Sequence, residues 1–172
     1  MPPRYGFPKQ GGILYLCAML KTTLLKAVEA GAAQLQHYFN GEFKVSNKEG
    51  VNNLVTEADH AAEKAIIDII QRDQPGHFIL SEESGAMIMD SEYKWIVDPI
   101  DGTVNFANGI PLCCVSIGLE KAGEMVMGVV YNPLMNEMFF AQKGFGASLN
   151  DKKISVSSKN ILSAHSRKAT VR

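Results

Sequence analysis

The feature of this sequence that most constrains its fold is a change in the spacing of apolar residues near position 77. Before this point apolar residues recur every three or four positions, as on the buried face of a helix. After it they alternate with polar residues, as in strands with one buried face. Helices followed by strands with short antiparallel connections predict an α+β layered domain, and not a parallel sheet of βαβ units.

Two helices are predicted in the first part of the chain. One covers about residues 20–39, where an apolar face recurs at helical spacing until an Asn-Gly pair stops it. The other begins after Thr56, and Pro75-Gly76 ends it.

The second part of the chain reads as strands and turns. Gly144, Gly146 and Asn150-Asp151 punctuate a further hairpin-like piece after the last long strand. The predicted strands are His77–Ser81, Tyr93–Val97, Val115–Glu120, Met125–Tyr131 and Glu137–Gln142.

Composition and charge narrow the class of protein. A length of 172 residues suits one compact domain, and 46% apolar with 20% charged residues excludes wholesale disorder. The net charge of −1 indicates no polyanionic partner, so we expect no nucleic acid to bind. Charge is uneven along the chain: residues 73–120 hold eight acidic residues and one basic residue, Lys94. This middle segment is rich in ligands for a hard cation.

The cysteines and the N-terminal segment indicate the cellular compartment in which we expect the protein. Cys17 and the adjacent Cys113 and Cys114 form neither a disulfide framework nor a zinc spacing, so we expect free thiols in a reducing cytoplasm. The apolar run Ile13–Leu20 is too short to cross a bilayer, and no small-x-small cleavage site follows it. We interpret residues 1–18 as a leader, leave open whether it is native, and expect no membrane partner.

Two apolar runs end in carboxylates that could bind a metal ion. Glu82 follows one predicted strand, and Asp98 and Asp101 surround a Pro-containing turn after another. Carboxylates three residues apart around such a turn can converge, with the carbonyl of Ile100 between them, and oxygen ligands suit Mg²⁺, Mn²⁺ or Ca²⁺. Taken alone, a surface turn or a solvated acidic pair explains each segment about as well.

Three further residues also have ordinary explanations. Thr56 can cap the second helix, and Asp59 in its first turn is favoured by the helix dipole. Lys48 reads as a surface lysine on a polar loop.

Together, however, these segments closely resemble the inositol monophosphatase family over about residues 20–160, and we assign residues 19–160 to the N-terminal part of a phosphatase domain. The resemblance implies a Mg²⁺-dependent, lithium-sensitive phosphomonoesterase with a layered α/β sandwich and a mainly antiparallel sheet, often a homodimer. The matching segments are Lys48, Leu54–Asp59 (LVTEAD), Ser81–Ser84 (SEES), Trp95–Phe106 (WIVDPIDGTVNF), Pro111–Leu119 and Gly128–Pro133.

The resemblance also implies roles in a metal site of two or three Mg²⁺ ions. Glu82, Asp98 and the carbonyl of Ile100 would hold one ion, and Asp98 with Asp101 would hold a second. Asp101 would also contact the substrate. Two such cations can activate a bound water, clamp the phosphate and stabilise the leaving alkoxide.

By the same resemblance, Thr103 and Asp59 would orient or deprotonate the attacking water, with Glu82 close by. Backbone amides near Gly102 and Thr103 would bind phosphate oxygens, as turn amides generally can. Lys48 matches a lysine that flanks the metal site on a loop.

Three departures from the family pattern affect the expected activity. Ser81 replaces a glycine, and the single tryptophan, Trp95, leaves no downstream Trp-Asp motif with a further metal ligand. From about Leu162 the sequence ceases to resemble the family, so residues 161–172 read as a divergent tail. We therefore expect a truncated or frameshifted product that is weakly active or inactive alone and self-associates through exposed core surface.

The function expected from the sequence is Mg²⁺-dependent hydrolysis of a small phosphorylated polyol, with inositol monophosphate as the best substrate. Phosphatases of 3′-phosphoadenosine and fructose 1,6-bisphosphate share the metal motifs and remain open. A non-catalytic fold remnant or dimerising fragment is the alternative from another class.

Overall fold

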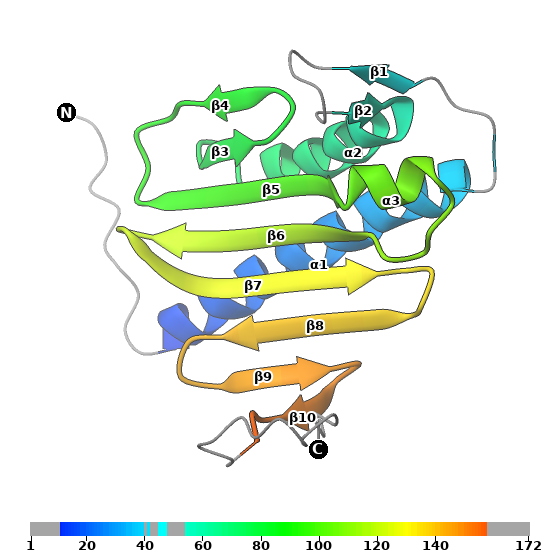
Figure 1. Ribbon diagram of the computed structural model, residues 1–172. Coiled ribbons are helices and arrows are strands. Elements are labelled where there is room, and N and C mark those ends of the chain that lie inside the picture. The colour runs from blue at the N-terminus through cyan, green and yellow to red at the C-terminus, as the bar shows by residue number, and fades with distance from the viewer. Residues whose placement is uncertain (1–10, 40, 42–44, 48–53, 158–172) are drawn as a thin grey trace.

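A computed structural model of the chain describes residues 11–39, 41, 45–47 and 54–157, which form helices packed against one large sheet (Figure 1). The helices are α1 (Gly11–Phe39), α2 (Glu57–Asp73) and α3 (Thr103–Ala107). The strands are β1 (Val45–Asn47), β2 (Leu54–Thr56), β3 (Phe78–Ser81), β4 (Gly85–Met87), β5 (Tyr93–Asp101), β6 (Cys114–Lys121), β7 (Glu124–Asn132), β8 (Glu137–Gln142), β9 (Gly146–Leu149) and β10 (Lys152–Ile154).

The large sheet has eight strands in the order β10-β9-β8-β7-β6-β5-β3-β4. Each neighbouring pair is antiparallel except β3 and β5, which run parallel because the chain passes through β4 at the sheet edge before returning as β5. Strands β1 and β2 pair with each other separately. The predicted α+β class with a mainly antiparallel sheet is confirmed.

Helices α1 and α2 form a layer behind the centre of the sheet, with α1 on β6 and β7 and α2 on β5 (Figure 1). The two helices also pack on each other, and Gly31 permits the close approach: a Cβ there would lie 2.7 Å from Cδ1 of Ile66. Trp95 and Val97 of β5 point into this layer and are buried. Burial of these apolar side chains supplies the main driving force of the fold.

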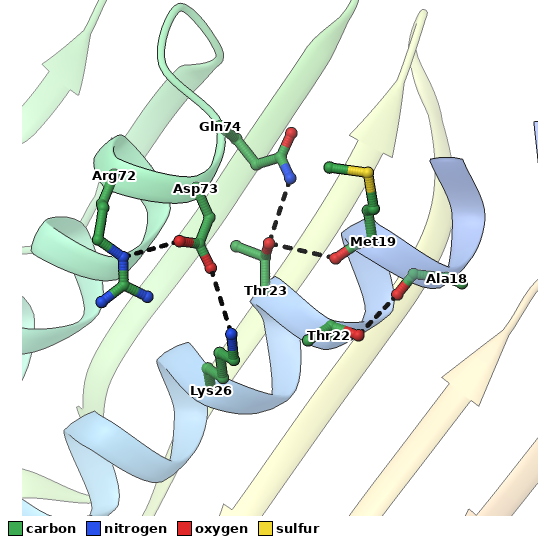
Figure 2. A network of polar contacts seen from close by, with 8 residues as sticks. All are labelled: Ala18, Met19, Thr22, Thr23, Lys26, Arg72, Asp73 and Gln74. Carbon is green, nitrogen blue, oxygen red and sulfur yellow. Dashed lines mark hydrogen bonds and ion pairs between the residues drawn. The ribbon is translucent and has the colours of Figure 1, made fainter. Parts of the chain in front are cut away.

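A polar network joins α1 to the end of α2 (Figure 2). Gln74 Nε2 donates to Oγ1 of Thr23 at 3.2 Å, and both side chains are buried. Closer to solvent, Asp73 lies 2.8 Å from Nε of Arg72 and 3.9 Å from Nζ of Lys26. The buried pair satisfies two polar groups in the core, while the exposed ion pairs contribute little to stability.

The predicted elements differ from the observed ones mainly at their ends. Helix α1 begins at Gly11 and not near residue 20, because nothing in the run before Leu20 stops a helix, and Leu20 and Cys17 pack on the core. Strand β5 runs four residues beyond Val97. The predicted hairpin turn at Asn150-Asp151 is confirmed, and both residues take positive φ angles of 47° and 63°. Residues 1–10 and 161–172 of the predicted leader and tail lie outside the described residues.

The second face of the sheet, which we call the open face, lies opposite α1 and α2. Residues paired across neighbouring strands share a face, so the row Asp98, Ser116, Val130 and Phe139 lies on it. Val130 is 39% exposed and Phe139 38% exposed. Among the described residues, no helix combines the length and apolar character needed to span a membrane.

Candidate functional site

An irregularity in β5 brings Asp98 and Asp101 to the same side of the sheet. In a regular strand, residues three apart point to opposite faces. Here Asp98 pairs with Ser116 and Asp101 with Cys114, so β5 has one residue more than β6 over this stretch. Because of this β-bulge, the side chains of Asp98 and Asp101 point to the same face of the sheet. Pro99 fits inside it because the bulge does not need its missing N–H.

Glu82 reaches the same place from the neighbouring strand. Because β3 and β5 are parallel neighbours, their C-terminal ends lie side by side at the same end of the strands. The backbone N–H of Glu82 donates to the carbonyl of Val97 at 3.1 Å, which extends the pairing one residue past β3. The structure therefore brings Glu82 beside Asp98, as the sequence predicted.

The pKa of Asp98 is affected by the carboxylates gathered around it. Burial, followed by repulsion from Glu82 and Asp101, raises the pKa of the Asp98 carboxyl to about 7, and Asp59 adds to the effect. Its Oδ1 atom is buried and has no hydrogen-bond partner. The one basic residue of the acidic segment, Lys94, lies 2.9 Å from Glu120. A buried, unpartnered carboxylate oxygen among like charges is suited to a cation.

Thr103 links the turn after β5 to helix α2. Its Oγ1 lies 3.0 Å from the carbonyl of Ile100 and 3.3 Å from Oδ1 of Asp59. The hydroxyl has one proton, so it can donate to one of these acceptors at a time. Asp59 is 1% exposed and is fixed in the first turn of α2. Thr103 and Asp59 thus lie together, as the sequence predicted for the water-activating pair.

Gly102 has two reasons to be glycine. Its φ is 89° and ψ 36°, a left-handed conformation that permits the turn from β5 into α3. A Cβ at this position would also lie 2.9 Å from the carbonyl oxygen of Leu112. The loop that returns to β6 is held against the turn by Asn105, whose Nδ2 donates to this same oxygen at 2.8 Å.

A hollow of about 330 Å³ opens beside Asp101 on the open face. Asn105, Asn132 and Glu137 supply polar groups to its lining. Asn132 is itself held, because its Nδ2 donates to the carbonyl of Pro111 at 2.9 Å. Leu112, Val130 and Phe139 supply apolar side chains to the lining.

Glu63, which the sequence did not identify as a site residue, holds the segment of residues 82–84, which we call the Glu82 loop. Glu63 on α2 is buried, and its Oε1 accepts hydrogen bonds from the N–H of Ser84 at 2.9 Å and from its hydroxyl at 3.2 Å. A signal was present: Glu63 follows Asp59 by four residues and falls on the apolar face of the helix.

The replacement of a family glycine by Ser81 needs no unusual backbone. Ser81 lies in β3 and is not among the residues with a positive φ, so a side chain is tolerated there. Its Oγ is buried without a hydrogen-bond partner. The backbone leading into Glu82 is therefore an ordinary strand.

The two adjacent cysteines are poorly suited to act as nucleophiles. Burial raises the pKa of the Cys113 thiol to about 11, and burial with the nearby Asp101 and Asp98 raises that of Cys114 to about 12. Both thiols are protonated at neutral pH, and the thiolate is the reactive form. In the described part of the chain all three cysteines are free, as predicted.

The oxygen ligands at the site fit a hard cation, but the carboxylates do not converge closely enough to coordinate one together. Within the described ranges, no three His, Cys, Asp or Glu side chains are arranged so that they could hold a metal ion. Binding by Glu82, Asp98 and Asp101 together would thus require these side chains to move closer. Lys48 and the side chain of Thr56 lie outside the described residues.

The fold and the site define a class of protein: an α+β sandwich with carboxylates gathered at the ends of neighbouring strands in a mixed sheet. The model of the inositol monophosphatase family matches residues 18–172, and the chain belongs to this family. The resemblance predicted from the sequence is confirmed, and the match also includes residues 161–172, which read as a divergent tail in the sequence.

Curated relatives carry two kinds of name. An inositol-1-monophosphatase of Synechocystis is 44% identical over 133 residues, covering 77% of this chain and 46% of the relative. A Nus factor SuhB of Pasteurella multocida is 39% identical over 145 residues, covering 84% and 54%. The chain spans about half the length of the curated relatives it matches.

Solved structures share the fold. The extragenic suppressor protein suhB from Bartonella henselae superposes with a TM-score of 0.79 at 38% identity, covering 81% of this chain and 55% of that one. An IMPase/NADP phosphatase complexed with Mg²⁺ and phosphate gives 0.70 at 27% identity, covering 85% and 55%.

Proposed function

We propose that this chain carries the metal-binding and water-activating groups of a Mg²⁺-dependent phosphoric monoester hydrolase. The proposed substrate is inositol monophosphate, a small phosphorylated polyol, and the products are inositol and phosphate. The observation that carries the proposal is Asp98: its Oδ1 is buried without a partner, and its pKa is raised beside Glu82 and Asp101. Membership of the inositol monophosphatase family supports it.

The proposed ligands are oxygen atoms from two strand ends. Glu82, Asp98 and the carbonyl of Ile100 would hold one Mg²⁺, and Asp98 with Asp101 a second. The carbonyl of Ile100 can take part although Thr103 lies 3.0 Å from it, because a carbonyl oxygen has two lone pairs. When bound, the ions would lower the pKa of a water, polarise the phosphate and stabilise the leaving oxygen.

Protein groups would prepare the water for attack. We propose that Oγ1 of Thr103 holds the water and that Asp59, 3.3 Å from this hydroxyl, takes up its proton, with Glu82 nearby. A buried carboxylate on a helix is well placed for this task because it cannot rotate freely away. No covalent intermediate with the protein is needed, in keeping with the protonated thiols of Cys113 and Cys114.

The substrate would bind beside these groups. Backbone amides at Gly102 and Thr103 would receive phosphate oxygens, and Asp101 would accept a hydroxyl of the polyol. The hollow beside Asp101 offers Glu137 as a further partner for hydroxyl groups. Lys48 keeps its proposed role beside the metal site. A cytoplasmic location and a homodimer complete the proposal for the intact protein.

The experiment combines metal binding with product release. Mg²⁺ is titrated while unfolding is followed, and phosphate release is measured on inositol 1-phosphate, 3′-phosphoadenosine and fructose 1,6-bisphosphate. A bound ion stabilises by about 2.7 kcal/mol at a hundredfold excess over its dissociation constant. Stabilisation by Mg²⁺ that Asp98→Asn abolishes supports the proposal. No response to Mg²⁺ would instead favour a non-catalytic fold remnant.

A chimera tests activity separately from metal binding. Because the chain spans about half the length of its curated relatives, we propose that it is weakly active alone, and that joining it to the second half of a family member restores phosphate release. The matched control is the same chimera with Asp98→Asn. A folded chimera as inactive as this control would contradict the proposed reaction.

A further inference from the structure

Glu63 is a buried carboxylate that the proposed reaction does not use. It lies one turn after Asp59 on α2, and only 6% of its surface is exposed. A buried carboxylate must be hydrogen-bonded or paired, because it has lost its hydration. Glu63 accepts two hydrogen bonds from Ser84, one at 2.9 Å from the N–H and one at 3.2 Å from the hydroxyl.

The segment that Glu63 holds is the one that carries Glu82. Ser84 follows Glu82 by two residues, and the N–H of Glu82 is bonded to Val97 of β5 at 3.1 Å. The segment 82–84 is thus attached at one end to β5 and at the other to α2. Since β5 also carries Asp98, these two attachments set how Glu82 lies relative to Asp98.

We propose that Glu63 is a positioning residue that fixes Glu82 for a divalent cation at Asp98, an inference that rests on the proposed function. Helix α2 acts as a rigid brace in this arrangement. Residues four apart lie on the same helix face, so Asp59 holds the Thr103 turn while Glu63 holds the Glu82 loop. Groups that orient metal ligands are commonly needed for full metal affinity.

A double-mutant cycle tests whether Glu63 acts through Glu82. Mg²⁺ affinity is measured by calorimetry for the unsubstituted chain, Glu63→Ala, Glu82→Gln and the double variant. We expect Glu63→Ala to weaken binding about tenfold when Glu82 is present and to cause no further loss in Glu82→Gln. Equal losses in the two backgrounds, or no loss in either, would overturn the inference.

Matched variants separate positioning from general damage. Asp68→Asn removes a carboxylate from the exposed side of the same helix, where it pairs with Lys64, and should leave Mg²⁺ affinity unchanged. Glu63→Gln keeps an acceptor for the N–H of Ser84 and should restore most of the affinity lost in Glu63→Ala. If Glu63→Ala does not fold, Glu63→Gln and Ser84→Ala take its place in the cycle, each with a smaller expected loss.

Amide hydrogen exchange without metal distinguishes this inference from the proposed function. Exchange in residues 82–84 should be faster in Glu63→Ala than in the unsubstituted chain and unchanged in Asp68→Asn. If the unsubstituted chain bound no Mg²⁺, this result would contradict the proposed function, independently of the role of Glu63. Unchanged exchange in Glu63→Ala would overturn the role of Glu63 whatever the result with Mg²⁺.

Discussion

At the scale of single residues, the site carries a free-energy cost that a cation could relieve. Asp98 lies near Glu82 and Asp101, and its pKa, raised to about 7, indicates that its charged form is disfavoured. The sequence predicted that these carboxylates converge. The sequence could not predict the contacts of Glu63. An acidic residue on an apolar helix face needs a hydrogen-bond partner, and the sequence does not show that this partner is Ser84.

Replacing Asp98 with Asn should stabilise the metal-free chain at alkaline pH. The folded chain holds a proton on Asp98 between its ordinary pKa of 3.8 and about 7, whereas the unfolded chain does not. The free energy of unfolding therefore falls as pH rises through this window, and the cost is fully present above pH 7. We expect Asp98→Asn to gain on the order of 1 kcal/mol near pH 8, after allowing for solvent screening, and less than half as much near pH 5.

Urea denaturation at the two pH values, with and without Mg²⁺, measures this effect. Mg²⁺ should stabilise the unsubstituted chain and leave Asp98→Asn unaffected. A variant less stable than the unsubstituted chain near pH 8 without metal would show that Asp98 is not under charge repulsion.

Replacing Gly102 with Ala should cost more than the same change at a similar turn. The positive φ of 89° alone costs an alanine about 1 kcal/mol. At Gly102 the new Cβ would also lie 2.9 Å from the carbonyl of Leu112, so the total should reach about 2–3 kcal/mol. Gly123 is the matched control, with a φ of 86° and nothing within 4 Å of a new Cβ. Equal losses of unfolding free energy in urea would show that the close approach to Leu112 carries no cost.

At the scale of elements, β5 shows what a sequence pattern can and cannot predict. Alternation in Tyr93–Val97 predicted the strand, because each side chain there faces either the helices or the open face. The bulge between Asp98 and Asp101 was not predictable, since it depends on the register with β6. The sequence predicted a turn at Pro99, whereas the chain stays in the sheet until Asp101.

The connection into β3 should make stability depend on pH through His77. Its Nδ1 accepts a hydrogen bond from Nε1 of Trp95 at 3.1 Å, and its ring stacks on Tyr93 at 4.8 Å. Burial lowers the pKa of His77 from 6.5. Below pH 6.5 the unfolded chain therefore takes up a proton first, and the free energy of unfolding falls until the folded pKa is passed. Protonation would also remove the acceptor that Trp95 uses.

Thermal unfolding between about pH 5 and pH 7.5 isolates this contribution as the difference between the unsubstituted chain and His77→Asn. The variant has no titrating group at this position, so the difference should shrink as pH falls. A constant difference across the range would mean that His77 does not titrate with folding.

At the scale of the whole molecule, the layers were predictable and the faces were not. The change in apolar period predicted helices against a sheet, and the structure has α1 and α2 on β5, β6 and β7. The pairing of residues across strands determines which side chains share the open face. A single bulge moves the residues after it to the opposite face of the sheet. For this reason the sequence predicted exposed core surface in general, but not its location at Val130 and Phe139.

The open face should make this chain self-associate. Val130 and Phe139 pair across β7 and β8, and with Leu80 and Met125 they expose apolar area on a sheet that the described helices leave uncovered on this side. Exposed apolar patches on a sheet face favour association because contact removes them from water. In sedimentation velocity, the average mass should rise with concentration, and Phe139→Lys should suppress this rise. Phe145→Lys, at a 72% exposed position in the β8–β9 turn, is the matched control and should leave it unchanged. A monomer at every concentration, or equal suppression by both variants, would show that the open face does not drive association.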